Sequence, residues 1–194
     1  MGAAVPDTIR IGVTGHRNIP EPLALRSMVR KAIEKEIPNL ALDNSPQFQL
    51  RILSPLAEGA DRVVAQAVLE CPGAQLQAVL PLVVEDYLED FATEESRKEF
   101  RELLALSSHP VWLRTRHIAE ESPEPGTQSR LRLDAYRRVG HYVVDHCDLL
   151  IAIWDGQRGT GSRHEAAEAP PISSNTPWIA IAGCSASGRT HSKR

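Results

Sequence analysis

The chain has 194 residues, of which 42% are hydrophobic and 24% are charged, and its formal net charge is −3. This composition is typical of one globular domain with a substantial core. It argues against a protein that coats nucleic acid, which usually carries a basic surplus. Cys71, Cys147 and Cys184 form no C-x-x-C pair, so the sequence predicts no metal site and no disulfide framework.

The sequence predicts no membrane partner. Its apolar runs are shorter than the roughly 18 residues that a membrane-spanning helix needs. Residues 1–6 have neither the charged region nor the apolar region of a signal peptide. We therefore expect a cytoplasmic protein with reduced thiols.

Apolar segments typical of strands alternate with segments of helical period along almost the whole chain. Strands are expected over residues 8–14, 48–53, 76–80, 111–113, 149–154 and 178–182. Helices are expected over residues 25–37, which Pro38 stops, and over 60–68, 85–106 with a break near 91–93, and 131–143. Residues 39–47 and 119–127 are expected to form surface loops, the second of them mobile.

This alternation predicts an α/β fold with a single Rossmann-like, doubly wound and mainly parallel sheet that has helices on both faces. The domain is expected to span residues 1–184. Residues 185–194 are small, polar and basic, and we expect them to form a disordered tail.

Three predicted strands end in turns that combine glycine with polar side chains, and in an α/β sheet a ligand binds where strands end. The first turn carries Thr14, Gly15, His16 and Arg17. A hydroxyl, an imidazole and a guanidinium each donate hydrogen bonds to phosphate or ribose. The alternative is a surface turn whose polar residues are incidental.

The second turn carries Glu58, Gly59, Ala60 and Asp61 at the start of a predicted helix. The free N–H groups and the dipole of a helix N-terminus attract phosphate, and a glycine there lets a ligand approach the backbone closely. Alternatively, Gly59 only forms a tight turn and Asp61 only complements the helix dipole.

The third turn follows residues 149–154 and carries Asp155, Gly156, Gly159 and Thr160. A glycine-rich turn after a buried strand is typical of a phosphate cradle, although this spacing matches neither a Walker loop nor the dinucleotide fingerprint. A plain flexible loop is the alternative. Together, the three turns predict one composite site for an anionic ligand.

Two further segments admit two interpretations each. Residues 136–138, Tyr-Arg-Arg, either reach this site or form a solvated face. His141, Asp145 and His146 lie on one predicted helix, where a histidine stabilised by the dipole of the helix C-terminus is favoured over a metal ligand.

The three turns together resemble a known family. The segments IGVTGHR at 11–17, SPLAEGAD at 54–61 and CDLLIAIWDG at 147–156 are similar to segments of the SLOG superfamily. These bacterial Rossmann-like proteins are related to the DNA-processing protein Smf/DprA and to the Lonely Guy phosphoribohydrolases. The resemblance implies a nucleotide or nucleotide-derived ligand, such as ADP-ribose, NAD or AMP, bound by a sensor or ligand-binding module. We expect no separate cofactor, and such relatives often form homodimers.

The third turn departs from the Lonely Guy pattern Pro-Gly-Gly-x-Gly-Thr-x-x-Glu. Arg163 stands where that pattern has glutamate, and Glu165 lies two residues further on, which turns it by about 200° on a helix. A binding module is therefore favoured over an enzyme. The alternative is a nucleoside-monophosphate N-glycosidic hydrolase in which Arg137 or Arg138 orients the ligand and Glu165 is catalytic.

Binding of single-stranded DNA is a third hypothesis, which the relation to the DNA-processing proteins raises. The acidic balance and the aromatic content of 5% count against it, because such proteins use basic grooves and stacking platforms.

Overall fold

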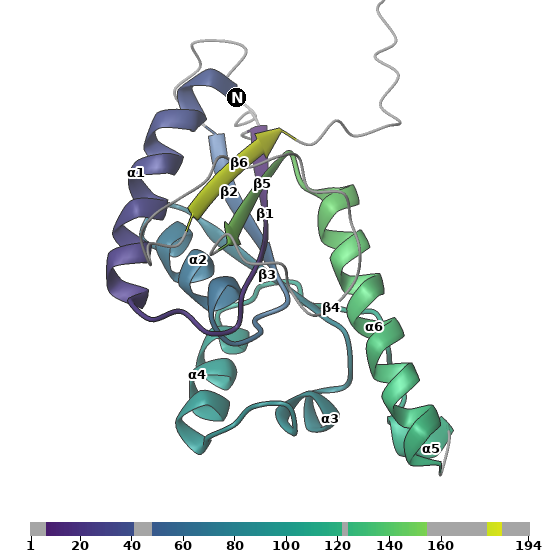
Figure 1. Ribbon diagram of the computed structural model, residues 1–194. Helices are drawn as coiled ribbons and strands as arrows, with labels where there is room; N and C mark the ends of the chain where they lie inside the picture. Colours follow the sequence, from purple (N-terminus) through teal and green to yellow (C-terminus); the bar gives the residue numbers. More distant parts are fainter. Residues whose placement is uncertain (1–6, 41–47, 122–123, 155–177, 184–194) are drawn as a thin grey trace, which may run out of the picture.

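A computed structural model of the protein describes residues 7–40, 48–121, 124–154 and 178–183. These residues form a six-stranded sheet with the strand order β4-β3-β2-β1-β5-β6 (Figure 1). The strands are β1 (Asp7–Gly15), β2 (Phe48–Ser54), β3 (Gln75–Leu80), β4 (Val111–Trp112), β5 (Leu149–Trp154) and β6 (Trp178–Gly183). Four of the five neighbouring pairs are parallel, and β5 and β6 are antiparallel. The predicted α/β fold with a mainly parallel sheet is confirmed.

Helices cover both faces of this sheet, as the doubly wound fold requires (Figure 1). On one face, α1 (Pro22–Leu40) and α2 (Ala60–Leu69) pack against each other. The long helix α6 (Pro125–His146) lies on the other face. The remaining described helices are α3 (Val84–Leu88), α4 (Glu94–Ala105) and α5 (Ile118–Glu121).

Two apolar clusters hold these layers together. The larger cluster joins the sheet to α1 and α2 and includes Ile11, Val29 and Val64, all fully buried. The smaller cluster joins Leu53 and Val79 of the sheet to Val139 of α6, with Tyr142 packed against it. Because successive side chains of a strand point to opposite faces, one sheet supplies apolar surface to both layers.

Two of the predicted boundaries are wrong. Residues 119–127 do not form one loop, because α5 continues to Glu121 and α6 begins at Pro125. A proline is compatible with the first turn of a helix, where its missing N–H would have no intrahelical acceptor. The helix α1 ends at Leu40 rather than at Pro38, which lies in its last turn.

The predicted break near residues 91–93 is confirmed. It separates α3 from α4, and Thr93 caps α4 because its Oγ1 accepts a hydrogen bond from the N–H of Ser96 at 3.1 Å. The predicted tail at 185–194 and most of the predicted loop at 39–47 lie outside the described residues.

Candidate functional site

The strand order reverses at β1, and this reversal defines the candidate site. β2 and β3 lie on one side of β1, whereas β5 lies on its other side. In the parallel register, Gly15 at the end of β1 is paired with Ile153 of β5, so the two strands end together. In open α/β sheets, ligands bind in the crevice at the carboxyl ends of such strands.

The first and second predicted turns meet at this edge. The N–H of Ala60 donates a hydrogen bond to the carbonyl of His16 at 3.0 Å, and the N–H of His16 donates to the carbonyl of Ile153 at 3.3 Å. A Cβ atom added to Gly15 would lie 2.6 Å from the Cβ of Ala60. The first and second turns are therefore in direct contact.

Gly59 has a specific structural reason to be glycine. Its φ is 82°, a backbone conformation that side chains disfavour, and an added Cβ would lie 2.2 Å from the carbonyl oxygen of Arg17. The close approach that the sequence predicted at Gly59 is made by the backbone of the first turn itself.

The backbone of the second turn uses several of its N–H groups within the protein. The N–H of Leu56 donates to Ser54 Oγ at 3.1 Å, and the N–H of Ala57 donates to Asp61 Oδ2 at 3.2 Å. Since Ala60 also donates to His16, three donors of this turn already have acceptors. An anion at this edge therefore depends on side chains as well as on the helix N-terminus.

Asp61 is buried beneath the first turn. Burial raises the pKa of its carboxyl group from 3.8 to about 7, although the Ala57 N–H and the positive charges of Arg17 and Arg62 act in the opposite direction. At neutral pH this carboxyl group is therefore close to half protonated. It carries less negative charge than an exposed aspartate would.

Arg17 is exposed at the same edge, where it follows the end of β1. Its guanidinium carbon lies 5.7 Å from the centre of the Tyr136 ring of α6, in a cation–π contact. Within the described part of the chain, Arg17 makes no hydrogen bond and no ion pair. None of its donors is occupied by the residues that the structure describes.

The first turn's other two side chains differ in exposure. Thr14 is exposed, and His16 is half-buried. Of residues 136–138, Tyr136 reaches this edge. Arg137 and Arg138 are exposed on α6, and Arg138 forms an ion pair with Asp134 at 2.7 Å.

A polar network that the sequence does not predict fixes Tyr136. The Tyr136 hydroxyl donates to the carboxylate of Asp90. Arg132, one turn earlier in α6, donates to Asp90 Oδ1 and to the carbonyl of Asp86, both at 2.9 Å. Asp86 in turn binds His117 Nδ1 at 2.9 Å and the N–H of Ile118 at 2.7 Å. The charged composition of residues 85–106 was the signal, but the partners lie 31 to 46 positions away in the chain.

These contacts also shift two pKa values. Burial raises the pKa of Asp90, against the opposing charges of Arg132 and Arg17. The hydrogen bond to Asp86 raises the pKa of His117, which strengthens their pairing. The network therefore ties α3, α5 and α6 together beside the candidate site.

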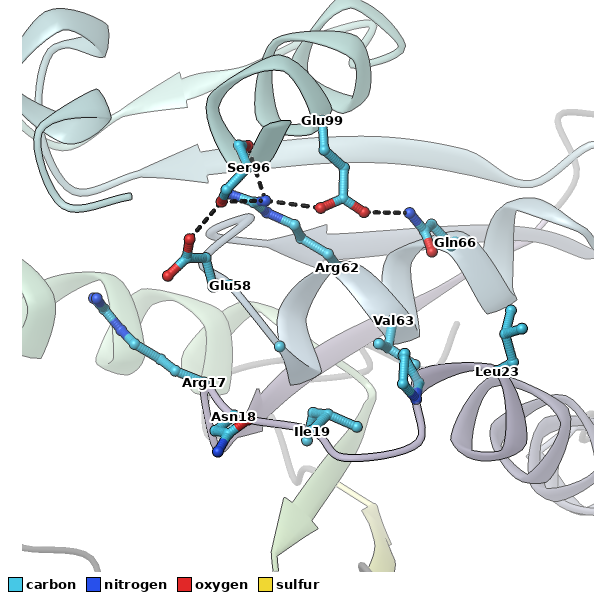
Figure 2. Close-up of a pocket in the computed structure, with 12 residues that line it drawn as sticks. Arg17, Asn18, Ile19, Leu23, Glu58, Arg62, Val63, Gln66, Ser96 and Glu99 are labelled. Carbon is cyan, nitrogen blue, oxygen red and sulfur yellow. Dashed lines mark hydrogen bonds and ion pairs between the residues drawn. The ribbon is translucent and has the colours of Figure 1, made fainter. Parts of the chain in front are cut away.

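A cavity of about 550 Å³ opens next to Arg17 (Figure 2). It lies between the turn that follows β1 and the residues of α2 and α4 that face it. Arg62 is buried in its wall, and its Nη1 donates to the carbonyl of Ser96 at 2.9 Å and to Glu99 Oε2 at 2.8 Å. Gln66 Nε2 donates to the other oxygen of Glu99 at 2.9 Å, and Glu58 accepts from the Ser96 hydroxyl.

The third predicted turn and the alternative catalytic glutamate lie outside the described residues. This applies to Asp155, Gly156, Gly159, Thr160 and Glu165. The last described residue before them is Trp154, at the end of β5.

The fold and its strand order define a Rossmann-like α/β protein whose candidate site lies at the carboxyl edge of the sheet, between β1 and β5. No protein-family model and no curated protein sequence matches the chain. Among the described helices, none is both long and apolar enough to cross a membrane.

Proposed function

We propose that the protein binds a nucleotide or a nucleotide-derived ligand at the carboxyl edge of its sheet and acts as a cytoplasmic sensor or ligand-binding module. The observation that carries this proposal is the position of the Arg17 guanidinium and its contacts. Its guanidinium stands at the strand-order reversal, held on the Tyr136 ring, and makes no ion pair or hydrogen bond within the described residues. A guanidinium presents a planar fork of donors that matches a phosphate group.

The surroundings of Arg17 support an anionic ligand. The positive charge of Arg17 acts to lower the pKa of two carboxyl groups, those of Asp61 and Asp90. Asp61 is close to half protonated at neutral pH, and Asp90 is paired with Arg132 at 2.9 Å. Neither carboxylate therefore neutralises the guanidinium fully.

Binding is favoured over hydrolysis by the state of these same carboxylates. Asp61 accepts a hydrogen bond from the Ala57 N–H, and Asp90 accepts from Arg132 and Tyr136. Both are occupied in holding the fold. A nucleotide ligand is also what the resemblance of the three turns to the SLOG superfamily implies.

A thermal-shift screen with ADP-ribose, NAD, AMP, ATP and cyclic nucleotides tests the proposal. A ligand at 100 times its dissociation constant is expected to add about 2.7 kcal/mol to the free energy of unfolding, which raises the melting temperature by several degrees. Arg17→Gln is expected to remove the shift. The matched control is Arg101→Gln, which changes an exposed arginine of α4 and leaves the site intact. The proposal is wrong if no compound shifts the wild-type protein, or if both variants respond as the wild type does.

A further inference from the structure

The charged side chains in the wall of the cavity already have partners. Arg62, Glu58 and Glu99 line it, whereas the guanidinium of Arg17 lies on the Tyr136 ring. Within the wall, Arg62 is paired with Glu99 at 2.8 Å, and Glu58 accepts hydrogen bonds from Ser96 and from the N–H of Ala92. An anion that entered this space would meet the carboxylates of Glu58 and Glu99 and a buried guanidinium that is already paired, so the cavity favours an uncharged group over a second phosphate.

The lining combines apolar surface with a few hydrogen-bonding groups. Ile19, Leu23 and Val63 supply the apolar part, and Asn18 places an exposed amide at the rim. Arg62 is only 3% exposed, and its Nη2 is a buried donor without a partner among the described residues. This atom has almost no accessible surface, and the guanidinium lies 4.6 Å from the centre of the Phe91 ring, so Arg62 shapes the wall of the cavity and leaves Asn18 as a polar group open to a ligand.

The cavity and the proposed anion site share Arg17. Arg17 is among the residues that line the cavity, and its side chain extends away from Asn18 and Ile19 (Figure 2). Its guanidinium carbon lies 5.7 Å from the centre of the Tyr136 ring. One ligand can therefore place a phosphate at the guanidinium and an uncharged group in the cavity. The volume of about 550 Å³ lies within the range of small-molecule pockets and exceeds what a phosphate alone would fill.

We infer that this cavity holds the base and ribose of a nucleotide whose phosphate is bound by Arg17. An aromatic base offers apolar faces to Leu23 and Val63, and its polar edge offers acceptors and donors to the exposed amide of Asn18. The inference rests on the proposed function and adds to it a place for the nucleoside part of the ligand.

The test compares AMP, GMP, CMP and UMP with ribose 5-phosphate, which lacks only the base. Calorimetry on the full chain is expected to show at least one nucleotide binding about tenfold more tightly than ribose 5-phosphate, since one well-packed ring contributes this much. Leu23→Trp and Asn18→Trp narrow the cavity from exposed rim positions, where they leave the core unchanged. We expect at least one of them to weaken that nucleotide about tenfold without changing the affinity for ribose 5-phosphate.

Leu133→Trp is the matched control, because Leu133 is a 51% exposed leucine of α6 outside the cavity lining. The inference is overturned if ribose 5-phosphate binds as tightly as every nucleotide, or if both rim variants bind the best nucleotide as the wild type does. In those cases a loss of all binding in Arg17→Gln still supports the proposed function. If Arg17→Gln changes nothing, or if the wild type binds none of the compounds, the proposed function and the inference both fail.

Discussion

Two arginines of this protein lie close together and have opposite environments. Arg62 is buried and donates to Leu56, Ser96 and Glu99. Arg17 is exposed and touches an aromatic ring, with no hydrogen bond or ion pair in the described part of the chain. Breaking a buried ion pair typically costs several kcal/mol, so Arg62 acts first as a structural residue. Since the described residues occupy none of the donors of Arg17, this contrast is why we assign the anion to Arg17.

Asp61 gives the protein a specific pH dependence. The pKa of its carboxyl group is about 7 in the folded protein, above the ordinary value of 3.8. Between these two values the unfolded chain has released the proton and the folded protein has kept it. The free energy of unfolding therefore falls as pH rises from about 4 to 7, and this contribution is constant above that range.

Asp61→Asn tests this assignment, because asparagine keeps an oxygen for the Ala57 N–H and cannot ionise. We measure the free energy of unfolding of both proteins by urea denaturation at pH 5 and pH 8. The decrease between these pH values is expected to be larger in the wild type than in the variant, by on the order of 2 kcal/mol. Every other titratable group is present in both proteins, so the difference between the two curves isolates Asp61. Parallel curves for the two proteins would contradict the raised pKa.

At the scale of elements, the β1 and β2 turns form one interlocked unit. The Ala60 N–H binds the His16 carbonyl, and the space next to Gly59 is filled by the carbonyls of His16 and Arg17. The position of Arg17 therefore depends on the absence of a side chain at residue 59. A binding residue in one turn is held in place by a glycine in the next.

Gly59→Ala is expected to be destabilising for two reasons. The residue would be strained at a φ of 82°, which costs about 1–3 kcal/mol, and its Cβ would displace the backbone of Arg17. The matched control is Gly73→Ala, since Gly73 has a similar φ of 74° and nothing within 4 Å of an added Cβ. Denaturant melts are expected to show a larger loss for Gly59→Ala. Binding of ADP-ribose should weaken in that variant alone. Equal losses of stability with unchanged binding would show that the contact does not position Arg17.

Helices and strands are predicted well from the sequence where a pattern of neighbouring residues defines them. The helical stripe of Leu25, Val29 and Ile33 is a repeat of four residues, and all three side chains are buried. The break before α4 has a local cause in the Thr93 cap. In contrast, α5 was missed because it is one short turn with polar neighbours, and its anchor is the burial of Ile118 against distant residues.

The candidate site is predictable only in part, because some of its contacts join residues that are far apart in the sequence. Strand ends are visible in the sequence, so Thr14–Arg17 and Glu58–Asp61 were singled out and lie together. Ser96 and Glu99 lie 34 and 37 positions from Arg62, and Asp90 and Asp86 lie 42 and 46 positions from Arg132. Such pairings depend on how helices are placed around the sheet, which periodicity does not encode.

At the scale of the whole molecule, the site joins the two helical layers. Arg17 follows β1 and the cavity continues toward α2 and α4, whereas Tyr136 belongs to α6 on the opposite face of the sheet. The strand-order reversal is what lets groups from both layers approach one point at the sheet edge. A ligand at Arg17 would therefore contact segments more than 100 residues apart in the chain.

Hydrogen exchange monitored by mass spectrometry tests this arrangement. Saturating ADP-ribose is expected to slow amide exchange in two separate segments, residues 14–19 and residues 132–138, because local opening of either one would break contacts to the ligand. The ligand also raises the free energy of global unfolding, so amides that exchange only through global unfolding should all slow by the same factor. In Arg17→Gln both local effects should vanish together, since the guanidinium is the link between β1 and α6.

The exchange pattern separates a bridging ligand from one that binds a single layer. The end of α4 provides an internal reference, because residues 104–107 are not among the residues that line the cavity. Protection confined to residues 14–19 would place the ligand on the β1 turn without α6, which contradicts the role given to Tyr136. Protection of residues 132–138 that persists in Arg17→Gln would mean that α6 binds the ligand independently. Only simultaneous protection that depends on Arg17 fits a site built from both faces of the sheet.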